Sequence, residues 1–158
     1  MNEDAKDTKG AKVRVPPPLI FILCIALAWA VDRFLPWHFV SPLWLKVASI
    51  ALILVGFWVL LQLLVLFKRQ QTAIEPWKPT TFIITNGYYR YSRNPIYLAF
   101  CCFPIGLGFY IGSIWLLLST LPALFGVYWF AIRAEEAYLL AKFPDDYGDY
   151  IRRVRRWL

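Results

Sequence analysis

The sequence predicts an all-α polytopic membrane protein with four transmembrane helices and a C-terminal amphipathic helix at the membrane interface. Composition is the first observation behind this prediction. Of the 158 residues, 59% are hydrophobic and the mean hydropathy is +0.51, whereas soluble domains are about 45–50% apolar. Length is the second, because a transmembrane helix needs roughly 17–25 mostly apolar residues. Four apolar segments are long enough to consider as spans, at residues 18–35, 43–67, 95–110 and 114–134.

The basic residues are distributed unevenly along this chain, whose formal net charge is +7. They precede the first apolar segment, fill the connector between the second and third, and follow the fourth, while the first short connector holds only Arg33 and Lys46. Cytoplasmic loops carry the excess of Lys and Arg. We therefore expect both termini and the long connector in the cytoplasm, in an integral protein of a bacterial inner membrane. The basic surface then serves contact with membrane lipids, and no nucleic acid is expected as a partner.

The first half of the chain divides at its polar segments. Residues 1–17 are rich in charge and poor in apolar residues, which predicts a disordered cytoplasmic tail. Residues 18–158 follow as a single membrane domain. The short segment 32–42, which contains prolines, joins the first two spans as an outer loop. Residues 68–92 contain turn-forming residues and make up a cytoplasmic connector.

The third span has a clear predicted start and an irregular middle. Asn94 is a preferred N-cap residue, and Pro95 at the first helical position loses no needed hydrogen bond. Pro104, Gly106 and Gly108 are expected to interrupt the middle of the helix. Such residues are tolerated within a membrane where a neighbouring helix or a cavity satisfies the freed backbone groups.

The fourth span is expected to be continuous and to end at residues 133–136. The connector at residues 111–113 is so short that the third and fourth helices must be neighbours. Residues 135–158 form the cytoplasmic C-terminal segment. Its mixture of aromatic, basic and acidic residues predicts a helix that lies along the interface.

Polar residues gather at the cytoplasmic boundary of the last two spans. Arg93 precedes the third helix, and both an arginine and a helix N-terminus can bind carboxylates or phosphates. Glu135 and Glu136 close the fourth helix, where the helix dipole disfavours negative charge. A simpler interpretation is that these residues are a topology flank and a solvated helix end. Because the two helices are neighbours, we expect instead a site for a ligand that carries an anion together with a diol or a cation.

The remaining polar or small residues give weaker signals. Gly106 and Gly108 do not follow a strand, which excludes a dinucleotide-binding loop; they either permit close helix packing or leave room for a flat ligand. Cys24, Cys101 and Cys102 lie in apolar runs, as small hydrophobic residues do. The His and Cys spacings predict no metal site, and no residue is assigned a catalytic role.

These residues belong to a longer pattern in the C-terminal half of the chain. The pattern comprises Gly87-Tyr88-Tyr89, Arg93-Asn94-Pro95-Ile96-Tyr97, Gly106-Leu107-Gly108, Glu135-Glu136 and Phe143-Pro144-Asp145-Asp146-Tyr147-Gly148-Asp149-Tyr150. In this pattern the chain resembles the membrane methyltransferases that include isoprenylcysteine carboxyl methyltransferase and the phospholipid methyltransferases. The resemblance implies a site for S-adenosylmethionine, with S-adenosylhomocysteine as product, between the last two spans and the tail. Two positions depart from the family pattern, since Asn94 replaces a His and Pro144 replaces a Gly.

The resemblance also implies which residues bind the cofactor: Tyr89, Arg93, Asn94, Pro95, Tyr97, Gly106, Gly108, Glu135, Glu136, Tyr147 and Tyr150. Arg93 and the start of the third helix would hold the carboxylate, and Glu135 or Glu136 the diol or ammonium. The tyrosines would wall the adenine or face the sulfonium. The implied acceptor is a lipophilic or amphiphilic small molecule that enters from the bilayer, such as an isoprenylcysteine-like carboxylate, a phospholipid amine or a thiol.

Two alternatives remain open. The segment Tyr91-Ser92-Arg93-Asn94-Pro95-Ile96-Tyr97 also resembles sterol reductases, which use NADPH but usually have more than four spans. A non-catalytic membrane subunit that keeps the pattern for folding is the other alternative.

Overall fold

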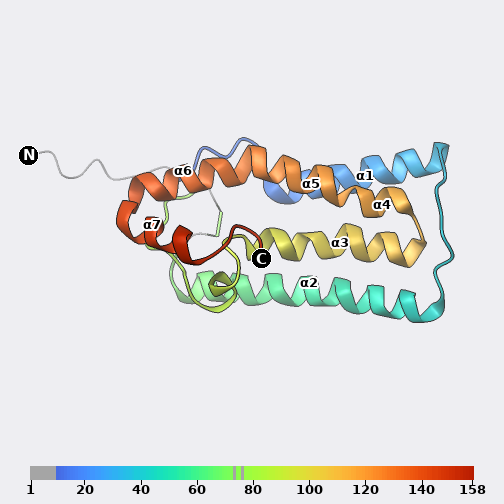
Figure 1. Cartoon of the computed structure of the whole chain (residues 1–158), viewed down its shortest axis with the longest axis horizontal. Helices are drawn as coiled ribbons and strands as arrows, with labels where there is room; N and C mark the ends of the chain where they lie inside the picture. The colour runs from blue at the N-terminus through green and yellow to red at the C-terminus, as the bar shows by residue number, and fades with distance from the viewer. Residues whose placement is uncertain (1–9, 73, 76) are drawn as a thin grey trace, which may run out of the picture.

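The computed structural model describes residues 10–72, 74–75 and 77–158 of the chain. The described part is helical and contains no strand, only an isolated bridge between His38 and Ser113. The helices lie lengthwise, side by side, in an elongated bundle (Figure 1). They are α1 (Pro17–Phe34), α2 (Leu43–Arg69), α3 (Pro95–Ile111), α4 (Ile114–Leu118), α5 (Thr120–Val127), α6 (Arg133–Lys142) and α7 (Pro144–Arg153), with a 3₁₀-helix at Gly87–Arg90 and a π-helix at Tyr128–Ile132.

Three helical stretches are long and apolar enough to cross a membrane. They are α1, α2 and the run Ile114–Lys142, which comprises α4 to α6. Helix α2 buries only Ser49, Gly56 and Leu63, so most of its apolar side chains face outward, as expected where lipid replaces water. The fourth predicted span, α3, is apolar but has 17 residues.

The expectation that α3 is interrupted was wrong. Pro104 lies inside one continuous helix that runs from Pro95 to Ile111. The helix tolerates Pro104, which is almost fully buried, because packing fixes the surrounding turn and a proline removes only one backbone donor. Helix α3 contacts α2 along its length and also meets α1, α4 and α5. It is therefore the central helix of the bundle.

The fourth span is one helical run, Ile114–Lys142, as expected, but the expectation that it ends at residues 133–136 was wrong. The run is irregular at Ser119, between α4 and α5, because Pro122 has no N–H to offer the carbonyl one turn earlier, although Ser119 keeps right-handed helical φ and ψ of −61° and −19°. A π-helix then follows at Tyr128–Ile132, and α6 continues to Lys142. Glu135 and Glu136 therefore lie in the first turn of α6, so the unfavourable position at a helix C-terminus does not apply to them.

The C-terminal segment is not one interfacial helix. Its first part, through Lys142, extends the preceding helix, and the chain then turns at Phe143 and starts α7 with Pro144. Helix α7 buries Tyr147 and Tyr150 against the rest of the protein. Residues 154–158 contain no helix and return to the start of α3 (Figure 1).

The two short connectors meet at the opposite end of the bundle. The backbone N–H of Phe39 donates to the carbonyl of Gly112 over 2.8 Å. Asp32, at the end of α1, accepts from Ser113 Oγ at 2.8 Å and lies 2.7 Å from His38 Nε2. Gly112 has φ of +81°, and a Cβ atom there would lie 2.3 Å from the Phe39 carbonyl oxygen. A glycine is therefore required in this turn.

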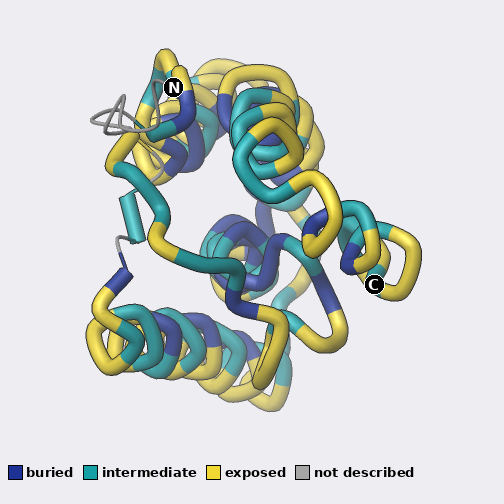
Figure 2. The backbone as a smooth tube through the Cα atoms, turned by 90° about the vertical axis from the view of Figure 1, so that its left-hand side faces the viewer, coloured by how far each residue is buried: buried dark blue, intermediate teal, exposed yellow. Residues whose placement is uncertain are grey.

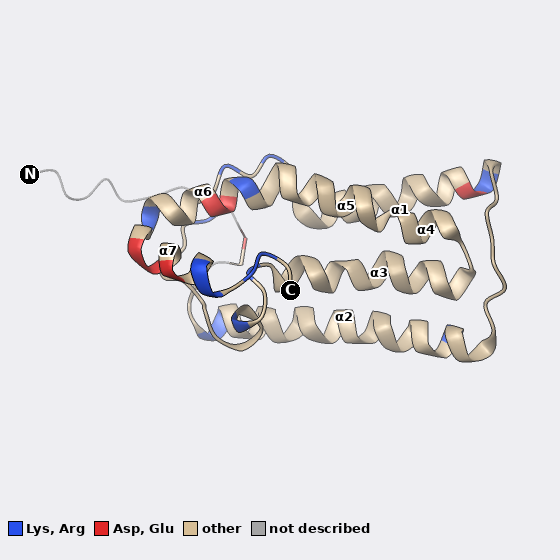
Figure 3. Cartoon of the chain, in the orientation of Figure 1, with Lys and Arg blue, Asp and Glu red and all other residues tan. Residues whose placement is uncertain are grey.

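The charged residues lie mainly at the end that holds α6, α7 and the long connector (Figure 3). The core is formed where α1, α3 and α5 meet, around Phe21, Val127 and Ile132. Seen from the polar end, buried positions face the interior and exposed ones the outside (Figure 2). Residues 1–9 of the expected tail lie outside the described part, while Gly10 donates its N–H to the Trp77 carbonyl at 3.0 Å and Ala11 is buried.

Candidate functional site

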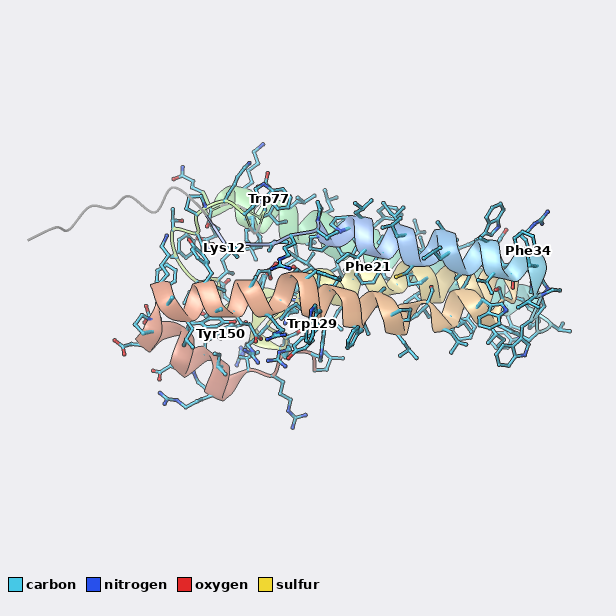
Figure 4. The ribbon with its side chains drawn as sticks, turned by 90° about the horizontal axis from the view of Figure 1, so that it is seen from above. Lys12, Phe21, Phe34, Trp77, Trp129 and Tyr150 are labelled. Carbon is cyan, nitrogen blue, oxygen red and sulfur yellow. The ribbon has the colours of Figure 1, made fainter. Side chains whose placement is uncertain are left out.

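A cavity of about 130 Å³ lies at the polar end of the bundle. Phe34 marks the opposite end of the molecule, whereas Trp77 and Tyr150 lie near the cavity end (Figure 4). The polar lining residues are Glu75, Thr80, Tyr89, Arg93, Asn94, Tyr97, Glu135, Tyr138, Tyr147 and Tyr150, and the apolar ones are Ala11, Phe67, Ile74, Phe82, Ile83, Ile84, Ile96 and Leu139. The lining combines two acids, one base and several tyrosines with an apolar wall, which suits an amphipathic ligand.

Glu135 and Tyr97 form the centre of the polar lining. The Tyr97 hydroxyl, on the first turn of the central helix α3, donates to Glu135 Oε1 over 2.5 Å. Glu135 follows the π-helix, in which Arg133 N–H bonds to the carbonyl of Tyr128, five residues earlier. One extra residue turns all later side chains by about 100° around the helix axis. The π-helix thus determines the direction in which Glu135 projects.

Arg93 and Glu136 form the second polar group. Arg93 Nη1 lies 3.0 Å from Glu136 Oε1, and Arg156 donates to both carboxylate oxygens of Glu136, from Nε at 2.9 Å and from Nη2 at 2.8 Å. The Arg93 side chain is only 9% exposed. Its Nε atom is buried and has no hydrogen-bond partner within the described residues. An unpaired donor of a buried guanidinium, at a cavity wall, is a position for an anionic ligand.

Asn94 occupies the predicted N-cap position of α3 but does not cap the helix with its side chain. Its Nδ2 donates instead to the backbone carbonyl of Arg156 at 3.0 Å, and its own N–H bonds to Ser92 Oγ at 3.1 Å. The expected side-chain cap was therefore wrong. The amide is used to hold the C-terminal tail, and Pro95 fills the first helical position as predicted.

Helix α7 closes one side of the cavity with two buried tyrosines. Tyr150 donates to the backbone carbonyl of Tyr89 over 2.6 Å, which links α7 to the 3₁₀-helix. Burial, followed by the charge of Glu136, raises the pKa of Tyr147 to about 12. Burial also raises the pKa of Tyr150 and of Tyr89 above their usual values. All three phenols are therefore neutral hydrogen-bonding groups at physiological pH.

Gly106 and Gly108 lie outside the cavity lining, in contacts between helices. A Cβ atom on Gly106 would lie 2.5 Å from Ile53 of α2, and one on Gly108 would lie 2.8 Å from the backbone nitrogen of Leu117 in α4. These distances leave no space for a ligand. Of the two functions that the sequence left open for these glycines, close helix packing is the one that the structure places here.

The structure also brings residues to the site that sequence reasoning did not include. Arg156 contacts Glu136, Ala11 comes from the expected tail, and Tyr138 comes from one turn after Glu135. Only Tyr138 could have been predicted from the sequence, because it lies three positions after Glu135 and positions three or four apart share a helix face. Ala11 and Arg156 lie in irregular segments, and of these two only Ala11 lines the cavity.

The long apolar helices indicate an integral membrane protein, and a cavity lined by polar and aromatic residues lies at one end of the bundle. A model of the phospholipid methyltransferase family matches residues 44–146. This match covers well over half of the chain, so the protein belongs to the phospholipid methyltransferase family and is a membrane methyltransferase. A search of curated proteins found no match. The family match includes Arg93, Glu135 and Glu136 and ends before Tyr147, Tyr150 and the C-terminal tail.

Proposed function

We propose that this protein uses S-adenosylmethionine to methylate a lipophilic or amphiphilic acceptor at the membrane surface. The observation that carries the proposal is the position of Arg93, Tyr97 and Glu135, all from the family-matched region, around one cavity. S-adenosylmethionine supplies an electrophilic methyl group on a sulfonium and has a carboxylate, an ammonium, a ribose diol and an adenine as handles.

The donors and acceptors of the cavity fit these handles. Arg93 keeps a buried, unpaired Nε–H for the carboxylate. Glu135 accepts the Tyr97 hydrogen bond on Oε1, which leaves Oε2 for an ammonium or a diol. Glu136 is already held by two arginines, so Glu135 is the better of the two predicted acids for direct contact.

The protein would accelerate methyl transfer mainly by alignment and by exclusion of water. In-line displacement requires the acceptor atom and the methyl carbon to be held close together and aligned with the breaking bond. The tyrosines of α7 can cover the ligand and face a cation with their rings. The residues lining the cavity provide no imidazole, and a carboxylate or thiolate acceptor would not need a general base.

The cavity volume implies that the wall moves when a ligand binds. At about 130 Å³ the cavity is smaller than the roughly 300–1,000 Å³ typical of small-molecule sites. Phe82, Ile83 and Ile84 of the connector form part of the apolar wall and lie in no helix. We expect this wall to shift outward on binding, with the acceptor entering from the bilayer beside it.

The proposal includes four membrane crossings with both termini in the cytoplasm. Helix α3 has a length of about 25 Å at 1.5 Å per residue, which is slightly shorter than the roughly 30 Å hydrocarbon layer. Its far end is nevertheless bonded to the connector between α1 and α2, through Phe39 and Gly112. If α1 and α2 cross the membrane, α3 must reach the same side. The basic excess at the cavity end supports a cytoplasmic location for the site.

Isothermal titration calorimetry on the purified protein in nanodiscs tests this function. We expect S-adenosylhomocysteine to bind and NADPH not to bind. Glu135→Gln should weaken binding about 10- to 100-fold, because a hydrogen bond to a charged group contributes about 1.5–3 kcal/mol. Asp149→Asn is the matched control, since Asp149 is exposed and pairs only with Arg152 among the described residues.

Two outcomes would contradict the proposal. Binding of NADPH without S-adenosylhomocysteine would favour a membrane reductase, and binding of neither would favour a non-catalytic subunit. Transfer of a radiolabelled methyl group to phosphatidylethanolamine, to a prenylcysteine and to an alkyl thiol, compared in parallel, would then identify the class of acceptor.

A further inference from the structure

The C-terminal tail is fastened to the segment that precedes α3. Arg93 N–H donates to the Arg155 carbonyl at 3.0 Å. Asn94 Nδ2 and Ser92 Oγ both donate to the Arg156 carbonyl, at 3.0 and 3.3 Å. Three consecutive residues of the family-matched region thus hold a tail that lies beyond the match. This arrangement fixes the backbone on both sides of the Arg156 side chain.

The Arg156 side chain is held by two residues, Glu136 and Tyr128. Its guanidinium donates to both oxygens of Glu136 and lies over the Tyr128 ring, 5.1 Å from the ring centre. The hydrogen bonds and the charge of Glu136 raise the pKa of Arg156 above its usual value. The following residue, Trp157, packs against the hydrophobic core. Arg156 is therefore a fixed cation, in contrast to Arg152, whose side chain is 77% exposed.

The bidentate contact between Arg156 and Glu136 leaves the positive charge of Arg93 only partly neutralised. Arg156 satisfies both oxygens of Glu136, and Arg93 contributes only a single contact to Oε1. Two guanidinium groups and one carboxylate leave one positive charge in the cluster. The more buried of the two cations is Arg93, with 9% of its side chain exposed against 36% for Arg156, and only Arg93 lines the cavity.

We propose that Arg156 is a positioning residue that keeps Arg93 available for the carboxylate of the cofactor. Arg156 binds both carboxylate oxygens of Glu136. Without Arg156, Glu136 would form a bidentate pair with Arg93 and neutralise the charge of Arg93. Asn94 contributes by holding the tail that carries Arg156. This inference rests on the proposed function, because it assigns a positioning residue to the same site, which binds the cofactor carboxylate.

Comparison of two ligands that differ only in the carboxylate tests the inference. One is S-adenosylhomocysteine, and the other is its decarboxylated analogue, 5′-deoxy-5′-(3-aminopropylthio)adenosine. In Arg156→Gln we expect affinity for S-adenosylhomocysteine to fall about 10-fold or more, as for a lost charge-assisted contact, with little change for the analogue. Arg152→Gln, which removes the same charge from an exposed ion pair, should leave both affinities unchanged.

A second variant keeps the test decisive if Arg156→Gln folds poorly. In the double variant Arg156→Gln/Glu136→Gln no carboxylate remains to capture Arg93, so the preference for the carboxylate-bearing ligand should return. Arg156→Lys should give an intermediate preference, since a lysine cannot bind both oxygens with a planar fork.

The outcomes separate the inference from the function beneath it. Equal losses for the two ligands in Arg156→Gln, or no recovery in the double variant, would overturn the positioning role while leaving the cofactor assignment intact. Failure of the wild-type protein to bind S-adenosylhomocysteine would overturn the proposed function itself.

Discussion

Tyr97 and Glu135 are 38 positions apart in the sequence, yet the tyrosine hydroxyl donates to the carboxylate over 2.5 Å. The bond joins the central helix α3 to the helix that follows the π segment. It fixes one carboxylate oxygen of Glu135, a residue that lines the cavity. The same contact is both a link between two helices and the means by which the acid is oriented.

Tyr97→Phe should therefore weaken cofactor binding without unfolding the protein. The ring remains to fill the buried position, while Glu135 loses the donor that orients it. We expect the affinity for S-adenosylhomocysteine to fall about 10-fold, within the range of about 1.5–3 kcal/mol for a hydrogen bond to a charged group. Calorimetry measures the change.

Tyr91→Phe is the matched control for this prediction. Tyr91 lies in the same segment, but it is 71% exposed and does not line the cavity. Equal affinities for wild type and Tyr97→Phe would show that the orientation of Glu135 has no part in binding.

Much of the fold follows from hydrophobic segments and turn residues. The starts of α1, α2, α3 and α4 were predicted within one residue, because apolar length and proline positions determine them locally. The convergence of Arg93 with Glu135 and Glu136 was also predicted, since the connector between α3 and α4 is so short.

The path of the fourth helix could not be predicted in the same way. The π-helix depends on packing, with Ala131 and Ile132 fully buried in the core, and no local pattern marks it. The role of Arg156 has the same origin. A basic residue near a C-terminus indicates topology in the sequence, and only the folded tail shows that it contacts Glu136.

Gly108→Ala should destabilise the protein and leave cofactor affinity unchanged. The new Cβ atom would lie 2.8 Å from the backbone nitrogen of Leu117, and a helix backbone cannot move aside as a side chain can. Overpacking of this kind costs about 1–3 kcal/mol, which thermal unfolding in detergent would detect as a lower midpoint. Calorimetry on the folded protein should give the wild-type affinity.

Gly148→Ala provides the comparison for Gly108→Ala. No atom lies within 4 Å of the position that the Cβ would take at Gly148, and alanine is favoured over glycine in a helix by roughly 0.5–1 kcal/mol. A slightly higher midpoint is expected. A loss of affinity in Gly108→Ala at unchanged stability would instead place this glycine in the ligand site.

Stability should fall as the pH rises from about 10 to about 12. Burial raises the pKa of Tyr147 to about 12, against about 10 in an unfolded chain. Within this window the unfolded chain releases a proton that the folded chain retains. The unfolded state then binds fewer protons, so stability decreases with increasing pH.

Tyr147→Phe should show a shallower decrease over that window and the same slope as the wild type below pH 10. The slope contributed by one such tyrosine is at most about 1.4 kcal/mol per pH unit. Tyr89 and Tyr150 retain part of the decrease, because burial raises their pKa values as well. Thermal midpoints measured across the window test the prediction, and parallel profiles for variant and wild type would contradict it.

Cysteine labelling should place the two ends of α3 on opposite sides of the membrane. The native cysteines Cys24, Cys101 and Cys102 are first replaced by alanine, and single cysteines are then introduced at three exposed positions. Val40→Cys and Ile111→Cys lie at the connector end, where 90% and 48% of the side chains are exposed. Tyr91→Cys lies at the cavity end.

In intact cells a membrane-impermeant maleimide should label the first two cysteines and spare the third. The reason is that the bond between Phe39 and Gly112 holds both connectors on one side, while the basic excess retains the cavity end in the cytoplasm. After permeabilisation all three should react, which controls for accessibility. Labelling of Val40→Cys alone, with both Tyr91→Cys and Ile111→Cys spared, would mean that α3 does not cross, and the far end of the bundle would then need a different position relative to the membrane.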